Sequence, residues 1–303
     1  MKIEGGCLAA LLFLGAAAAQ AATSEHFTVH DGVKRRYIVY EPASADGSRL
    51  RPALLNFHGG GGHAEQHARS SGMDRVAERH GFFVVYPEGT SGGPRLLTWN
   101  AGRCCGYAAR HKVDDVGFVR KVIAEVVRDY PVDPDRVYIA GHSNGAMFAY
   151  RFAAEASELV AGAGIVAGSL EVDGPAPKRP VPLVVFHGLK DQNVLWQGGK
   201  GPNQFDPTPH RAIPQTLAIW KKWDRCADAP AQTVRAADYV MERCEPAGAA
   251  GGAPIVLYKL PNGGHTWPGG EPGARFLNLG PHVTMVDASE LMWQFFASLP
   301  QRK

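Results

Sequence analysis

The chain has 303 residues, of which 45% are hydrophobic and 20% charged, and its net charge at pH 7 is +3. This length and composition suit a globular α/β protein with a substantial core. The positive charge is small and its Lys and Arg residues are scattered, which argues against a nucleic-acid partner.

Residues 1–21 have the pattern of a cleaved secretory signal. An apolar run over 8–19 is followed by Ala19-Gln20-Ala21, small residues at the cleavage spacing. The run is shorter than the ~20 apolar residues that span a bilayer, and Cys7 precedes it rather than closing it. We therefore predict a signal peptide at 1–21, no membrane anchor, a secreted protein (extracellular or periplasmic), and a single domain over 22–303.

Apolar runs alternate with helical patterns along the rest of the chain. Strands are predicted at 36–40, 53–57, 82–86, 137–140, 164–167, 183–186 and 255–260, and helices at 73–79, 116–127, 144–156, 214–224 and 288–299. Asp114 and Asp115 precede the second helix, where carboxylates cap a helix and favour its dipole. The alternation implies an α/β-hydrolase fold, with a mostly parallel sheet, helices on both faces, and a site at the carboxyl ends of the strands.

The strand at 53–57 runs directly into the glycine loop His58-Gly59-Gly60-Gly61-Gly62. Such a loop lets backbone amides approach the oxygen of a tetrahedral acyl-transfer intermediate. We expect the amides of Gly60 and Asn144 to form this oxyanion hole.

Residues Gly141-His142-Ser143-Asn144-Gly145 lie between a predicted strand and a predicted helix. This is the sequence form of a nucleophile elbow, in which the serine occupies a strained turn and the glycines allow strand and helix to approach. The pattern predicts Ser143 as a nucleophile.

A serine nucleophile needs a base and an acid, which follow it in the chain in that fold. Asp191 stands in the turn after strand 183–186, with Asp206 and Asp287 as alternative acids. Of the twelve histidines, His265 alone follows a strand on a glycine-bent loop in the correct chain order. We predict the triad Ser143, Asp191 and His265, with neither metal nor organic cofactor.

Four cysteines follow the signal, and an even count in an exported chain suggests disulfides. Cys226 and Cys244 bracket two short strand-like segments, 232–234 and 239–241, and closing that loop would stabilise the fold by about 3 kcal/mol. The neighbours Cys104 and Cys105 suggest either a vicinal bridge or, with His111, a metal site. No Cys-x-x-Cys spacing supports the metal.

Four segments, 99–106, 113–118, 141–147 and 263–269, together resemble secreted polyhydroxybutyrate-depolymerase-type esterases, which are similar to bacterial feruloyl and acetyl-xylan esterases. The resemblance covers about 27–296. It implies Ser143 as nucleophile, Asp191 as acid, His265 as base and a Cys226–Cys244 bridge. Extracellular depolymerases usually append a polymer-binding module, for which no residues remain, so we expect a monomer that cleaves small or oligomeric soluble esters.

Among the aromatic side chains near the predicted rim, Trp267 and Trp99 are the candidates for substrate contact, since a flat apolar wall suits an aryl ring or a hydroxyalkanoate chain. Two other functions remain open. An exported serine peptidase would use the same triad, and a catalytically silent binding protein would keep the scaffold without turnover.

Overall fold

The computed structural model describes residues 20–93, 96–174, 176–246, 251–272 and 278–301. Nearly all of the predicted signal peptide lies outside these residues. The strands are β1 (Ala22–His30), β2 (Val33–Glu41), β3 (Arg51–Phe57), β4 (Phe83–Pro87), β5 (Val132–His142), β6 (Gly162–Val166), β7 (Leu183–Gly188), β8 (Gln232–Arg235), β9 (Val240–Cys244) and β10 (Ile255–Leu260). The helices are α1 (Ala64–Ser71), α2 (Met73–His80), α3 (Gly106–Arg110), α4 (Asp115–Asp129), α5 (Asn144–Glu155), α6 (Ile213–Trp223) and α7 (Ala288–Ala297), with a 3₁₀ turn η1 (Ser157–Leu159).

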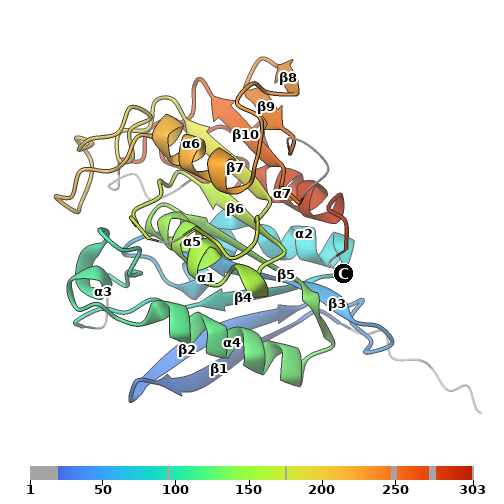
Figure 1. The fold of residues 1–303 in the computed structure, drawn as a ribbon. Helices are drawn as coiled ribbons and strands as arrows, with labels where there is room; N and C mark the ends of the chain where they lie inside the picture. Colours follow the sequence, from blue (N-terminus) through green and yellow to red (C-terminus); the bar gives the residue numbers. More distant parts are fainter. Residues whose placement is uncertain (1–19, 94–95, 175, 247–250, 273–277, 302–303) are drawn as a thin grey trace, which may run out of the picture.

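All ten strands join one sheet in the order β1-β2-β4-β3-β5-β6-β7-β10-β9-β8 (Figure 1). The six central strands, from β4 to β10, run parallel. The outer pairs at both edges are antiparallel. The predicted mostly parallel sheet is confirmed, and every strand and helix predicted from the sequence corresponds to an element of the structure.

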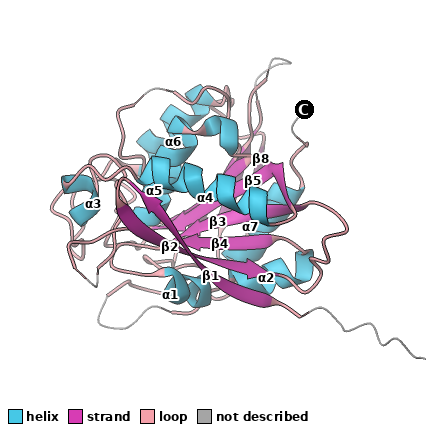
Figure 2. Cartoon of the chain, turned by 90° about the horizontal axis from the view of Figure 1, so that it is seen from below, coloured by secondary structure: helices cyan, strands magenta, loops and turns pink. Residues whose placement is uncertain are grey.

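Helices cover both faces of the sheet, as predicted. Helices α4, α5 and α6 bury their apolar sides in one core, against side chains such as Leu55 and Val185. Helices α1, α2 and α7 pack on the other core, against Leu54 and Val184. In Figure 2, α5 and α6 lie toward the top of the view and α1 and α2 toward the bottom, with strands of the sheet between them. Alternate residues of each buried strand therefore pack in two separate apolar layers, one on each face of the sheet.

Strand β1 and helices α1 and α3 were not predicted from the sequence. Strand β1 lies at the sheet edge and buries one residue, Thr28, so its sequence lacks a strong apolar alternation. It pairs with β2 through a two-residue turn at Asp31 and Gly32, both at positive φ, which fits a tight hairpin. None of the helices in the described ranges has the length and apolar character needed to cross a membrane.

Candidate active site

Ser143 stands between β5 and α5 in the strained backbone conformation of a nucleophile elbow, with φ 54° and ψ −122°. A Cβ added at Gly141 would lie 2.4 Å from the carbonyl oxygen of Gly145, and one at Gly145 would lie 2.4 Å from those of Phe57 and His58. Both positions therefore require glycine, because any side chain would separate the strand from the helix. Strained backbone conformations such as that of Ser143 are common at functional sites.

Ser143, His265 and Asp191 form one chain of hydrogen bonds. His265 Nε2 lies 2.7 Å from Ser143 Oγ, and His265 Nδ1 lies 2.7 Å from Asp191 Oδ2. The amides of Asn193 and Val194 donate to the other oxygen of Asp191 at 2.8 and 2.9 Å. The structure thus brings together the three residues of the predicted triad, from the loops after β5, β7 and β10.

Asp191 and His265 are both buried, with 2% and 4% of their surface exposed. Burial alone would raise the pKa of Asp191, but the charge of His265 and its hydrogen bond outweigh this effect, and the pKa lies below its usual value. The carboxyl group is therefore ionised at neutral pH, where it can orient the imidazole and stabilise a positive charge on it.

The glycine loop after β3 lies directly against the start of α5. A Cβ at Gly60 would be 3.6 Å from Cβ of Asn144, so the two predicted oxyanion donors are neighbours. The Asn144 side chain forms two hydrogen bonds with the main chain of Trp99. Trp99 N donates to Asn144 Oδ1 at 2.7 Å, and Asn144 Nδ2 donates to Trp99 O at 2.9 Å. This pair of bonds fixes the first residue of α5, and the first amides of a helix have no intrahelical partner and favour a negative charge.

His58, at the start of the glycine loop, holds that loop to the segment after β4. Its Nδ1 lies 2.8 Å from Gly59 O, and Gly89 N donates to its Nε2 at 3.0 Å. Burial lowers the pKa of His58 to about 4, so the ring is neutral and carries its proton on Nδ1. Burial, followed by the charge of His265, similarly lowers the pKa of His142 to about 3. These histidines support the site as neutral groups.

The two tryptophans expected to contact substrate lie in the cores. Trp99 is fully buried, stacks on Phe148 and donates from Nε1 to His58 O at 3.0 Å. Trp267 is 3% exposed, donates from Nε1 to Ser289 Oγ at 3.0 Å and packs on His67. The expectation of substrate contact is wrong for both rings in this structure, because each is covered by residues distant in sequence.

The other aspartates considered from the sequence have structural partners. Asp206 accepts hydrogen bonds from Gly106 N and Thr208 N, while Asp287 caps α7. Asp114 caps α4, as predicted. Asp115 lies in the first turn of α4, as predicted, and the structure adds that it is fully buried and pairs with Arg35 of β2 at 2.8 Å.

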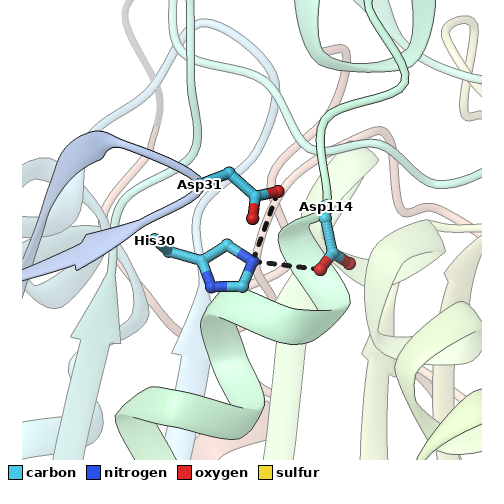
Figure 3. Close-up of side chains that lie close together, drawn as sticks. All are labelled: His30, Asp31 and Asp114. Carbon is cyan, nitrogen blue, oxygen red and sulfur yellow. Dashed lines mark hydrogen bonds and ion pairs between the residues drawn. The ribbon is translucent and has the colours of Figure 1, made fainter.

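Outside the triad, the described residues include two groups of three side chains whose possible metal-ligating atoms lie within 4.8 Å of one another. One group is His30, Asp31 and Asp114, and the other is His63, Glu65 and Glu88. In the first group, His30 Nε2 lies 3.0 Å from Asp114 and 3.8 Å from Asp31 (Figure 3). The His30–Asp114 contact ties the β1–β2 turn to the start of α4.

The cysteines form two pairs with sulfur atoms at bonding distance. Cys226 and Cys244 close an 18-residue separation around β8 and β9, with Cα atoms 5.8 Å apart. Cys104 and Cys105 form the vicinal pair, and Cys105 Sγ lies 4.0 Å from Met147 Sδ on α5. The vicinal pair thus contacts α5, the helix that follows Ser143, and the structure favours a bridge over a metal site at these residues.

The sequence did not single out Glu171 and His210, two buried side chains that follow β6 and β7. Their ionisable groups lie 3.7 Å apart, on loops that leave the same sheet edge as Asp191. No motif marks either residue, because the two residues lie 39 positions apart in the chain and meet only in the folded molecule.

Comparisons with known proteins show which proteins this chain is similar to. The family model described as "Esterase PHB depolymerase" matches residues 35–177. Feruloyl esterase B of Piromyces equi is 31% identical over 250 residues, which cover 80% of this chain and 45% of that protein. NocK of Nocardia uniformis subsp. tsuyamanensis, which carries the name of an esterase, is 32% identical over 280 residues, covering 83% of this chain and 76% of that protein. The chain thus spans less than half of the first relative and about three quarters of the second.

Among solved structures, an S-formylglutathione hydrolase from Agrobacterium tumefaciens matches with a TM-score of 0.59 and 13% identity, covering 92% of this chain and 96% of that chain. At that identity the match shows the fold alone. It confirms the predicted α/β-hydrolase architecture.

Proposed function

Because the chain belongs to the family of esterases of the polyhydroxybutyrate-depolymerase type, we propose that it is a secreted serine ester hydrolase that works through an acyl-enzyme. The observation that carries the proposal is the hydrogen-bonded chain from Asp191 through His265 to Ser143, beside the neighbouring amides of Gly60 and Asn144. Nucleophile, base, orienting acid and oxyanion donors are the parts that acyl transfer requires.

In the proposed reaction, His265 Nε2 takes the proton of Ser143 as Oγ attacks the ester carbonyl. The amides of Gly60 and Asn144 donate to the oxyanion of the tetrahedral intermediate. His265 then protonates the leaving alcohol, and the acyl group stays on Ser143. Water, deprotonated by His265, attacks the acyl-enzyme and releases the acid. Asp191 keeps the proton of the neutral imidazole on Nδ1 and stabilises the imidazolium at each step.

The proposed substrates are soluble esters with hydroxyalkanoate, hydroxycinnamate or acetyl groups. The support is the family's name together with the name of the feruloyl esterase relative. Secretion is supported by the pattern of residues 1–21 and by the two cysteine pairs, since disulfides persist in oxidising compartments. An exported serine peptidase is the alternative, because the same triad cleaves amides.

The test is hydrolysis of p-nitrophenyl acetate beside a peptide anilide. We expect ester cleavage alone, and loss of nearly all turnover in Ser143→Ala and in His265→Ala, since triad residues act as a unit. Asp191→Asn is expected to fold and to lose activity by about 10⁴-fold, as in other triads. Ser48→Ala, at an exposed turn, is the matched control. Full activity in folded Ser143→Ala, or anilide cleavage at the ester rate, would contradict the proposal.

The substrate class is tested separately with methyl ferulate, p-nitrophenyl acetate, a 3-hydroxybutyrate dimer and a polyhydroxybutyrate film. We expect the soluble esters to be cleaved much faster than the film, because efficient cleavage of a solid surface depends on the avidity that an added binding module supplies. Rapid clearing of the film by this chain would refute the preference for soluble esters.

A further inference from the structure

A second histidine lies beside the acid of the triad. His187 is near the end of β7, and neither its side chain nor that of Asp191 has exposed surface. Its Nε2 lies 3.8 Å from Asp191 Oδ2, the oxygen that His265 Nδ1 contacts at 2.7 Å. One carboxylate oxygen therefore lies between two imidazole rings, and the proposed reaction uses only one of them.

The hydrogen bond of His187 identifies the nitrogen that carries its proton. Nε2 lies 2.9 Å from the carbonyl oxygen of Val194, which can only accept, so Nε2 carries the proton and donates it. Nδ1 is buried and has no hydrogen-bond partner among the described residues. Burial lowers the pKa of His187 below its usual value, and the ring is neutral at pH 7. The ring therefore acts on its surroundings through Nε2–H.

This hydrogen bond closes the turn that holds Asp191. The amides of Asn193 and Val194 donate to Asp191 Oδ1 at 2.8 and 2.9 Å, so the place of the carboxylate depends on the place of these two residues. At the start of the turn, Asp191 N donates to Gly188 O at 3.2 Å. At its end, His187 Nε2 holds the carbonyl group of Val194. With Oδ1 held by the turn, Oδ2 faces the catalytic base.

We propose that His187 is a positioning residue of the triad: through Val194 it holds Asp191 in place for the catalytic base. The inference rests on the proposed esterase function and deepens it. A displacement of about 1 Å in a catalytic constellation can lower the rate by about 10²-fold, so a single hydrogen bond behind the acid can matter for turnover. The N–H dipole of His187, 3.8 Å from Oδ2, also favours the negative charge of the carboxylate.

The test is hydrolysis of p-nitrophenyl acetate by three variants, with urea unfolding to show that each is folded. His187→Gln places an amide N–H near the position of Nε2, His187→Asn places one near that of Nδ1, and His187→Phe provides none. We expect kcat to fall by about 10- to 100-fold in the Asn and Phe variants, with KM unchanged. The Gln variant is the matched control and should keep most of the activity. Equal kcat in the Gln and Asn variants would overturn the proposal.

A double-mutant cycle separates positioning from a general structural role. In the Asp191→Asn background, His187→Phe should cause little further loss of kcat, because the carboxylate that His187 positions is already absent. A loss by the same factor in both backgrounds would mean that His187 supports the fold without acting through Asp191, and would overturn the proposal.

The tautomer of His187 provides a test that requires no variant to fold. The ¹⁵N chemical shifts of its ring in the unmodified protein should be those of a neutral imidazole protonated on Nε2. A ring protonated on Nδ1 would overturn the proposal, because Nε2 could not donate to Val194. No hydrolysis of any ester by the unmodified protein is a different result, which would refute the esterase function itself and any catalytic role of His187 with it.

Discussion

Asp224, directly after α6, has a carboxyl group with no exposed surface and an incomplete set of partners. Val181 N donates to Oδ1 at 2.9 Å, and Oδ2 has no hydrogen-bond partner among the described residues. Burial raises the pKa of Asp224 to about 8. The folded protein therefore holds a proton at this site over a pH range in which the unfolded chain, with an ordinary pKa of about 3.9, has released it.

This difference in pKa makes stability depend on pH. Because the folded-state pKa is raised, the folded state binds more protons than the unfolded state between about pH 4 and pH 8, and the free energy of unfolding falls as pH rises through that window. The slope is about 1.4 kcal/mol per pH unit, so Asp224 alone removes about 4 kcal/mol between pH 5 and pH 8. That is a large part of the 5–15 kcal/mol typical of a folded domain.

Asp224→Asn removes the charge and keeps the shape, so its stability should exceed that of the unmodified protein by an amount that grows from pH 5 to pH 8. The measurement is urea unfolding of both proteins at each half pH unit, followed by subtraction of the two free-energy curves. Asp135→Asn, at an exposed position, controls for the change in net charge. Parallel curves for Asp224→Asn and the unmodified protein would refute the reasoning.

Three further predictions concern the elbow, the disulfide and the oxyanion hole. Gly145→Ala should prevent folding or inactivate the protein, because its Cβ would lie 2.4 Å from two carbonyl oxygens at the end of β3. The control is Gly93→Ala, which has open space around it and should melt like the unmodified protein in a thermal scan. Reduction of Cys226–Cys244 should lower the free energy of unfolding by about 3 kcal/mol, and mass mapping of unreduced peptides should recover this pair. Finding either cysteine linked elsewhere would contradict the pairing. Asn144→Ala removes two buried hydrogen bonds and should cost about 2–4 kcal/mol in urea unfolding while lowering kcat; unchanged stability would show that these bonds contribute nothing.

Much of the fold could be predicted because its signals are local. The central strands are buried on both faces, so they read as continuous apolar runs, and β10 illustrates this with Ile255-Val256-Leu257. Strand β1 has no such run, since an edge strand leaves most of its side chains in water. The elbow could also be predicted from the sequence, because the tight turn itself requires glycines close to the serine on both sides.

The sequence by itself therefore determined the order of most strands and helices along the chain, the elbow at Ser143, and the candidates Asp191 and His265. Only the tertiary structure decided what surrounds them. It buried Trp99 and Trp267, paired Asp115 with Arg35, and brought Glu171 within 3.7 Å of His210. The physical reason is that the conformation of a turn depends on its own few residues. Whether a ring is exposed, or which carboxylate faces a histidine, depends on segments that meet only when the sheet has formed.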